Sequence, residues 1–527
     1  TYNNDVVSEI LPGAYNCLYI GSLKGGVKEL NLTSGKLRDL LLKDEDNESI
    51  YCRTLLFATD NELWIGTESG AYIYNLRTGK YTHLRSSEYD PYSLSDNAIY
   101  SFCKDREDGI WIGSYFGGVN YYPRSYTHFE KYYPKGEENS LHGKRVREFC
   151  RDNYGVLWIG TEDGGLNRFN LNTKEFSFFA PSAGFTNIHG LCLVDDKLWV
   201  GTFSKGLKII DTRTGTVLKT YQKNSSPRSL IDNSIFAICR TATGDIYLGT
   251  MFGLVKYNKQ SDDFDRIPEL NGKFVYDIKE DSGGNIWLAT YANGAYCYNV
   301  NDRKWKNYVH DEKDTTSLSY NKVSSIFEDS YHRIWLTTQG GGFCLFHPES
   351  ETFTSYNSTD GLPSDVVYQI VEDKDGQLWL TTNNGLVYFQ PKTETMKVYT
   401  TANGLLGDQF NYRSSFEDEN GMIYFGGIDG FIAFNPKSFS ENKNLPTVVI
   451  TDFLLFNKEV YADEPNSPLE KNITFSDKIV LRADQNSFSF RISALGYQAP
   501  GMNKLMYKLE GFDNEWLSIG ESPLITY

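Results

Sequence analysis

Hydrophobic and polar residues alternate over short runs along most of the chain, as in strands with one buried face. Residues 364–399 show one complete unit. SDVVYQIVED alternates, KDGQ is a glycine-containing turn, and LWLTT, LVYFQP and MKVYTT follow as three more short apolar runs. Runs of this length and composition, separated by turn residues, predict four antiparallel strands.

The same unit recurs along the chain. A segment resembling LWIGT comes back ten times, and its aromatic residue is spaced by 40 to 48 residues: Tyr19, Trp64, Trp111, Trp158, Trp199, Tyr247, Trp287, Trp335, Trp379 and Tyr424. Four short strands per period of about 45 residues indicate a β-propeller blade. We therefore predict an all-β chain of tandem β-propellers with ten four-stranded blades and almost no helix.

Most repeats carry a D-x-x-G-x-[LI]-W turn, which we interpret as scaffold. Its glycine allows a positive φ, its aspartate bonds nearby backbone N–H groups, and its tryptophan packs between blades. The turn resembles the Asp-box of sialidase propellers. A glycosidase, however, needs two carboxylates facing each other across the substrate, whereas these acids occupy one turn per blade. The chain shows no G-x-S-x-G, H-E-x-x-H or P-loop motif, and we expect no catalytic residue.

Charge and cysteine usage narrow the function further. A net charge of −16 argues against nucleic-acid binding, which depends on neutralising phosphates. No run of 18 apolar residues is present, as a membrane-spanning helix would need. The eight cysteines are scattered singly, without metal-ligand spacing, so we expect free thiols, no metal site and no cofactor.

The repeats end near residue 437, and a different pattern begins at Pro446. Propellers usually close with four to eight blades, so ten repeats must be divided. After Pro446, alternating runs separated by turns predict an Ig-like β-sandwich. Because the chain begins at Thr1 and stops within an expected strand at Tyr527, we expect a fragment whose sandwich is only partial.

These segments together resemble a known family. Tandem LWIGT repeats, then DGLPSDVVYQIVEDKDGQLWLTTNNGL, then QNSFSFRISALGYQAPGMNKLMYKLEGFDNEW, are similar to the periplasmic sensor region of the hybrid two-component systems of Bacteroides-type gut bacteria. That region has two-component regulator propeller repeats followed by a Tyr-rich Ig-like domain. The resemblance covers essentially the whole chain, which departs from the family in having ten repeats and no cytoplasmic part.

The resemblance implies an organisation and a function. The family has two seven-bladed propellers, the sandwich, a transmembrane helix, a histidine kinase, a receiver and a DNA-binding domain. Counting back from the sandwich assigns residues 1–134 to three blades of a truncated propeller, 135–440 to a seven-bladed propeller and 441–527 to the truncated sandwich. The implied role is periplasmic sensing of an oligosaccharide from glycan breakdown, in a receptor that is a homodimer at full length. This region would touch the membrane only through the missing helix.

Candidate ligand-binding residues lie in loops at one end of the predicted blades. Aromatic loop tips are costly unless they pack or bind something, and sugars offer apolar faces to such rings. A basic stretch, HGKRVREFCRD, suits a uronate or sulfate. The candidates are Phe203, Lys205, Phe252, Tyr291, Asn293, Arg145, Arg147, His189, Gln339 and Arg413. The alternatives are packing against another propeller or subunit, a solvated charged strand end, a glycan-active propeller enzyme and a protein-binding scaffold.

Overall fold

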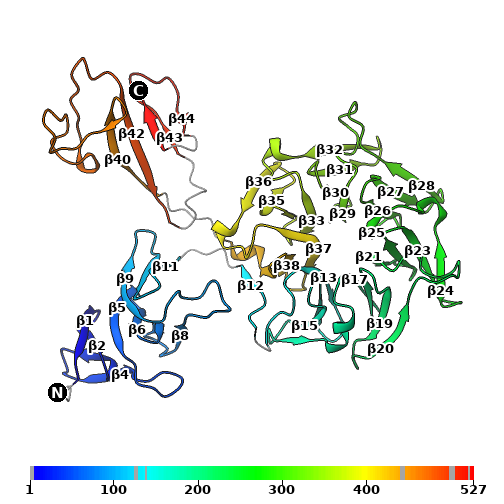
Figure 1. Cartoon of the computed structure of the whole chain (residues 1–527), viewed down its shortest axis with the longest axis horizontal. Coiled ribbons are helices and arrows are strands. Elements are labelled where there is room, and N and C mark those ends of the chain that lie inside the picture. Colours follow the sequence, from blue (N-terminus) through cyan, green and yellow to red (C-terminus); the bar gives the residue numbers. More distant parts are fainter. Residues whose placement is uncertain (1–4, 124–128, 137–138, 440–445, 498–504, 520–522) are drawn as a thin grey trace. The chain divides into compact units, whose positions relative to one another are not determined.

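The computed structural model describes residues 5–123, 129–136, 139–439, 446–497, 505–519 and 523–527, to which all structural statements refer. These residues form β-strands and short 3-10 helices, and the described part contains no α-helix. The chain divides into two units, Thr127–Ser440 and a second that combines Thr1–Tyr126 with Glu441–Tyr527. The predicted all-β propeller fold is confirmed (Figure 1).

Thr127–Ser440 is a ring of seven four-stranded blades around a central channel (Figure 1). Blades one to three are β13 (Val146–Arg151), β14 (Val156–Thr161), β15 (Leu166–Asn170), β16 (Phe176–Phe178); β17 (Ile188–Val194), β18 (Lys197–Thr202), β19 (Leu207–Asp211), β20 (Val217–Tyr221); and β21 (Ile235–Arg240), β22 (Ile246–Thr250), β23 (Gly253–Asn258), β24 (Asp263–Arg266). Blades four to six are β25 (Val275–Glu280), β26 (Ile286–Thr290), β27 (Ala295–Asn299), β28 (Lys304–Tyr308); β29 (Val323–Glu328), β30 (Ile334–Thr338), β31 (Phe343–His347), β32 (Thr352–Tyr356); and β33 (Val367–Glu372), β34 (Leu378–Thr382), β35 (Leu386–Gln390), β36 (Thr395–Tyr399).

The seventh blade closes the ring with a strand from the other end of the chain segment. It contains β37 (Phe410–Glu417), β38 (Ile423–Gly427) and β39 (Phe431–Phe434), and β12 (Glu130–Tyr132) pairs antiparallel with β39. The Tyr132 ring stacks on Phe431, with centroids 4.6 Å apart. The tenth repeat therefore supplies three strands of its blade and borrows the fourth, which lies before residue 135, the predicted start of this propeller.

The aspartate of the recurring turn is structural. Asp373 Oδ1 accepts N–H bonds from Asp375 and Gln377, each 3.0 Å long, and its Oδ2 accepts the Trp379 indole N–H at 3.0 Å. The same bond to the indole recurs at Asp105, Asp152, Asp281 and Asp329. Because Trp379 is only 2% exposed, this bond satisfies a buried donor. The geometry supports the interpretation of the turn as scaffold.

Glutamates at the ends of inner strands join neighbouring blades on the same rim. Glu328 accepts the backbone N–H of Ser282 from the preceding blade, and Glu372 accepts that of Ser330 in the same way. These carboxylates satisfy backbone donors of the adjacent turn, which would otherwise have no intrablade partner. They are therefore used in holding blades together.

The second unit contains the first three repeats and the C-terminal segment. The first two repeats form four-stranded sheets: β1 (Val7–Gly13), β2 (Cys17–Ser22), β3 (Gly26–Asn31), β4 (Leu37–Leu41); and β5 (Cys52–Thr59), β6 (Glu62–Thr67), β7 (Gly70–Asn75), β8 (Tyr81–Leu84). The third forms three strands, β9 (Ile99–Lys104), β10 (Ile110–Ser114) and β11 (Val119–Tyr122). This repeat therefore has three strands in the described residues, which stop at residue 123 and resume at 129.

The C-terminal segment forms one sheet and one hairpin. The sheet has the order β41 (Lys458–Glu459), β40 (Thr447–Leu455), β42 (Phe488–Leu495), β45 (Leu524–Thr526), and the hairpin pairs β43 (Met506–Tyr507) with β44 (Leu517–Ser518). An Ig-like sandwich needs two facing sheets, so that assignment stays a prediction. The 3-10 helices are η1 (Ala180–Gly184), η2 (Pro268–Leu270), η3 (Ser358–Asp360), η4 (Thr401–Asn403), η5 (Pro436–Ser438) and η6 (Ile473–Phe475).

Candidate functional site

The start of each inner strand of the ring carries an irregularity. In blades one to six the register shifts by one residue after the first pair, as between Val146 and Glu148 in β13. A bulge of this kind takes one residue out of the ladder and redirects its side chain. The displaced residues are Arg147, His189, Phe236, Tyr276, Ser324 and Tyr368. Side chains of different chemistry thus gather around one end of the channel.

The seventh blade has a larger irregularity at the same place. In β37 the register passes from Phe410 directly to Ser415, so residues 411–414 form an insert outside the ladder. This insert brings Tyr412 against Tyr276 of the fourth blade, with ring centroids 5.7 Å apart. The seventh blade therefore reaches across this end of the channel to the fourth blade.

Two of the three predicted aromatic loop tips join one cluster of rings. Phe203 lies 5.6 Å from His189, and Tyr291 lies 5.5 Å from Phe274 in a stacked arrangement. Phe236 connects the two ends, with centroids 4.6 Å from His189 and 4.5 Å from Phe274. We call the connected set the aromatic floor: His189, Phe203, Phe236, Phe274, Tyr276, Tyr291, Tyr368 and Tyr412.

Phe252 stands apart from the aromatic floor. Its side chain is 51% exposed, against 39% for Phe203 and 43% for Tyr291. The ring contacts of the described residues include Phe203 and Tyr291 but not Phe252. Of the three predicted loop tips, Phe203 and Tyr291 therefore belong to the aromatic floor and Phe252 does not.

Lys205 and Asn293 hold equivalent places in the loops of the second and fourth blades. The backbone N–H of Lys205 donates to Thr202 Oγ1 at 2.8 Å, and that of Asn293 donates to Thr290 Oγ1 at 3.0 Å. The threonine at the end of the second strand thus fixes the loop that follows it. Lys205 is exposed and Asn293 is half-buried.

Arg147 is buried completely and is only partly satisfied. Its Nη1 donates to the Tyr412 carbonyl at 3.2 Å, and its guanidinium carbon lies 4.6 Å from the centroid of the Tyr412 ring. Its Nε lies 3.9 Å from Glu162 Oε1, beyond hydrogen-bond distance. Among the described residues neither Nε nor Nη2 has a hydrogen-bond partner. Burial lowers the pKa of Arg147, partly offset by Glu162 and Glu148.

Arg413 belongs to an ion-pair network inside the channel. Its Nε lies 3.1 Å from Asp277 Oδ1, its Nη2 lies 3.7 Å from Glu148 Oε1, and its Nη1 donates to the Phe236 carbonyl at 3.0 Å. Burial opposes a charge here, but Glu148 and Asp277 outweigh it and raise the pKa of Arg413. Burial also raises the pKa of Glu148 to about 8, against the attraction of Arg413 and Arg147. Arg413 is already occupied by protein partners.

The remaining candidates differ in accessibility. Arg145 is exposed, and its backbone N–H donates to Asp163 Oδ1 at 3.1 Å. His189 is 7% exposed, and burial, with Arg147 nearby, holds its pKa well below the usual value, so the ring is neutral. Gln339 is half-buried, and its Nε2 has no partner among the described residues.

Several residues at this end of the channel were not predicted. Phe236, Phe274, Tyr276 and Tyr412 belong to the floor, and Lys322 Nζ lies 4.4 Å from the centroid of the Tyr291 ring. The predicted candidates were loop tips and residues of basic strand entries, not these aromatic residues. The signal for the floor was the residue that follows the first apolar residue of each inner strand, which is aromatic at Phe236, Tyr276 and Tyr368.

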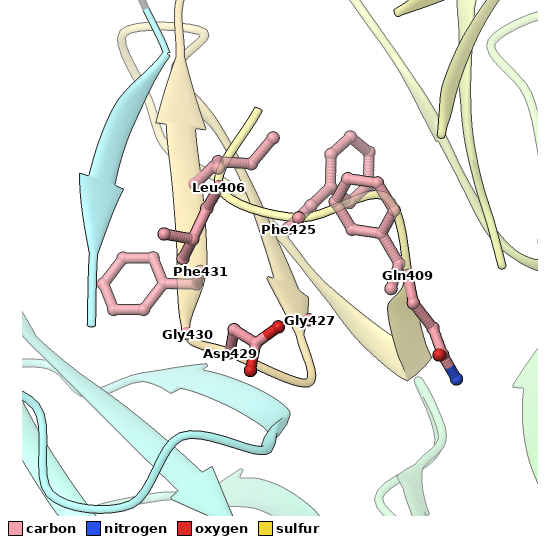
Figure 2. Close-up of a pocket in the computed structure, with 10 residues that line it drawn as sticks. Leu406, Gln409, Phe425, Gly427, Asp429, Gly430 and Phe431 are labelled. Carbon is pink, nitrogen blue, oxygen red and sulfur yellow. The ribbon is translucent and has the colours of Figure 1, made fainter. Parts of the chain in front are cut away.

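Two cavities in the ring differ greatly in size. The larger cavity, of about 410 Å³, lies in the channel. It is lined by Glu148 and by residues of β25, β29, β33 and β37, among them Arg413. The smaller, between the segment before β37 and the β38–β39 turn, is lined by Leu406, Gln409 and Asp429 among others (Figure 2). Its volume is about 10 Å³, room for about one water molecule, so it cannot hold a sugar.

The described residues contain no group of three or more histidine, cysteine or acidic side chains placed to hold a metal ion. No helix among them is long and apolar enough to cross a membrane.

Comparison with known proteins finds similar repeats and a similar histidine kinase. The sequence pattern of the two component regulator propeller family matches residues 93–116, 140–163, 269–292, 317–340 and 361–384. Histidine kinase P4 of Formosa agariphila is 28% identical over 339 residues, which are 62% of this chain and 24% of that protein. The chain therefore spans about a quarter of the length of this relative.

Solved structures agree with the fold. The extracellular domain of the hybrid two component system BT3049 from B. thetaiotaomicron superposes with a TM-score of 0.81 and 26% identity, over 99% of this chain and 68% of that one. The extracellular domain of BT4673 from the same organism superposes with a TM-score of 0.51 and 21% identity, over 100% of this chain and 71% of that one. The predicted resemblance to sensor regions of hybrid two-component systems is confirmed.

Proposed function

Because the repeats and fold are those of the extracellular domain of a hybrid two-component system, we propose that the chain is a periplasmic ligand-sensing region. It binds an oligosaccharide from glycan breakdown and signals through its C-terminal segment to a histidine kinase elsewhere in a homodimeric receptor. The chain resembles sensor domains rather than enzymes, so the ligand is bound and not consumed.

The observation that supports a sugar ligand is the aromatic floor. Phe203 and Tyr291 are partly exposed, yet Phe203 packs against the buried Phe236 and Tyr291 against the buried Tyr276. A ring held in place by its neighbours loses little conformational freedom on binding, and a sugar can stack its apolar face on it. Unsatisfied polar atoms at the bulged strand starts, Ser324 Oγ and Asn411 Nδ2, suit the hydroxyl groups of such a ligand.

The seventh blade offers a route for the signal. Its insert carries Tyr412 of the aromatic floor, and β39 of the same sheet is followed in sequence by the C-terminal segment from Thr447. A ligand that displaces Tyr412 would therefore act on the blade from which the chain continues. Such a change can shift a receptor only if ligand affinity differs between its two states.

Calorimetric titration with a panel of glycan-derived oligosaccharides tests the proposal. We expect one chemical class to bind, and chromatography of the mixture afterwards to recover the sugar unchanged. Turnover of the sugar would indicate a glycan-active enzyme instead. Failure of the whole panel to bind would reject the sensor function proposed here and favour a protein-binding scaffold.

A further inference from the structure

Three tyrosines of the aromatic floor form a row with a cation at each end. Tyr276 lies 5.7 Å from Tyr291 and 5.7 Å from Tyr412, with its plane tilted by 32° and 34° to theirs. Lys322 Nζ lies 4.4 Å from the centroid of Tyr291. The guanidinium carbon of Arg147 lies 4.6 Å from that of Tyr412. The row thus presents three mutually tilted rings between two positive charges.

The arginine end of the row contains hydrogen-bond donors without partners, although the Glu162 carboxylate lies 3.9 Å from Arg147 Nε. Nε and Nη2 of Arg147 and Nδ2 of Asn411 have no partner among the described residues. The two side chains are adjacent, because Nη1 of Arg147 lies 3.5 Å from Oδ1 of Asn411. Three buried donors without acceptors are unfavourable by themselves. A carboxylate or sulfate, which has only acceptors, would satisfy them.

We propose that the oligosaccharide is acidic, and that Arg147 and Lys322 recognise its anionic groups while Tyr276 and Tyr291 support the sugar rings. This inference rests on the proposed function and specifies its ligand. The Tyr412 ring covers the guanidinium in the structure. Because Tyr412 lies in the insert 411–414, outside the β37–β38 ladder, it can turn aside without breaking the sheet, and the anion then replaces it as the partner of Arg147.

The direct test compares each acidic sugar with its own neutral form. Oligosaccharides containing uronic acids are titrated beside their carboxyl-reduced counterparts, and sulfated ones beside desulfated counterparts. We expect each neutral form to bind about tenfold or more weakly, as for loss of a charged hydrogen bond, and the acidic form to lose affinity at high salt. The pair showing the larger difference identifies carboxylate or sulfate. Equal affinities within both pairs would overturn the inference while leaving sugar sensing intact.

Variants of the two cations give a second test. Lys322→Gln should weaken binding of the acidic sugar about tenfold and leave binding of the neutral form unchanged. Lys306→Gln is the matched control, because Lys306 also lies over a tyrosine, Tyr308 on β28, at 5.4 Å. Equal effects of the two variants would contradict a role for Lys322.

Arg147→Gln should weaken acidic binding more strongly than Lys322→Gln. Its control is Arg168→Gln, since Arg168 is half-buried and lies 4.8 Å from the ring of Trp158 on β14, with an unsatisfied Nε. If Arg147 serves only to pair with Glu162, both arginine variants will change stability and neither will change the preference for acidic sugars. If Arg147→Gln fails to fold, Lys322→Gln and the sugar pairs decide the question.

Discussion

Arg413 of the seventh blade forms an ion pair with Asp277 of the fourth blade, with 3.1 Å between Nε and Oδ1. Its Nη2 also lies 3.7 Å from Glu148 of the first blade. Neighbouring blades pack through their sheet faces, but the pair of Arg413 with Asp277 connects two blades that are not neighbours. The φ of Arg413 is +51°, a left-handed conformation that non-glycine residues seldom adopt. The insert thus keeps an unfavourable backbone to place one cation in the channel.

We expect Arg413→Met to destabilise the ring by about 3–5 kcal/mol, because removing the arginine leaves the buried Asp277 carboxylate without its counter-charge. The measurement is the urea-unfolding midpoint followed by tryptophan fluorescence. Arg228→Met removes a comparable pair with Asp263, but the Arg228 side chain is 47% exposed, so we expect a change below about 1 kcal/mol. Equal shifts for the two variants would show that the channel ion pairs contribute no more than surface ones.

Glu148 should make the ring less stable as the pH rises. Burial raises its pKa to about 8 from the ordinary 4.5. Between these values the folded protein keeps a proton that the unfolded chain has lost, so stability falls with increasing pH and levels off above the folded pKa. The slope is at most about 1.4 kcal/mol per pH unit. Thermal midpoints measured across this range should decline less steeply in Glu148→Gln. An identical slope in the variant would mean that Glu148 is ionised in the fold.

The double change Phe203→Ala with Tyr291→Ala should weaken oligosaccharide binding about tenfold or more, because each stacked ring contributes about 1 kcal/mol. Phe252→Ala is the control, since Phe252 has an equivalent loop position in the third blade but lies outside the aromatic floor. We expect it to leave the affinity unchanged. Calorimetry measures binding, and the melting temperature checks the fold. Unchanged binding with loss of dimerisation would make these rings an interface.

Closure by β12 should be visible in shortened chains. A chain of residues 127–440 contains Glu130–Tyr132, whereas one of residues 135–440 lacks the strand that pairs with β39. The shorter chain also loses the half-buried Tyr132 ring packed on Phe431, and about 3–5 kcal/mol, the cost of deleting a fully buried aromatic side chain, is the upper limit for this loss. We expect a lower melting temperature and faster hydrogen exchange in β38 and β39. Equal protection in both chains would show that the ring does not need this strand.

The periodic part of the molecule could be predicted from the sequence, and the irregular part could not. The spacing from Trp158 to Tyr424 marks the seven blades of the ring. Each repeat can be recognised because it makes the same local contacts, such as the bond from Trp379 to Asp373. Pairing of β12 with β39 joins residues about 300 positions apart, and a three-residue strand carries no pattern of its own. The insert 411–414 likewise follows from contacts across the ring rather than from local periodicity.

The closing strand makes the number of blades independent of the contact that closes the ring. Since β12 precedes the first blade yet completes the last, duplication or deletion of one whole period between β13 and β36 leaves the β12–β39 pairing untouched. Each blade between β13 and β36 is one continuous stretch of chain, so copying one period adds one complete blade. Such an event changes the circumference of the channel, and with it the spacing of Arg147 and Lys322, without requiring any new means of sealing the ring.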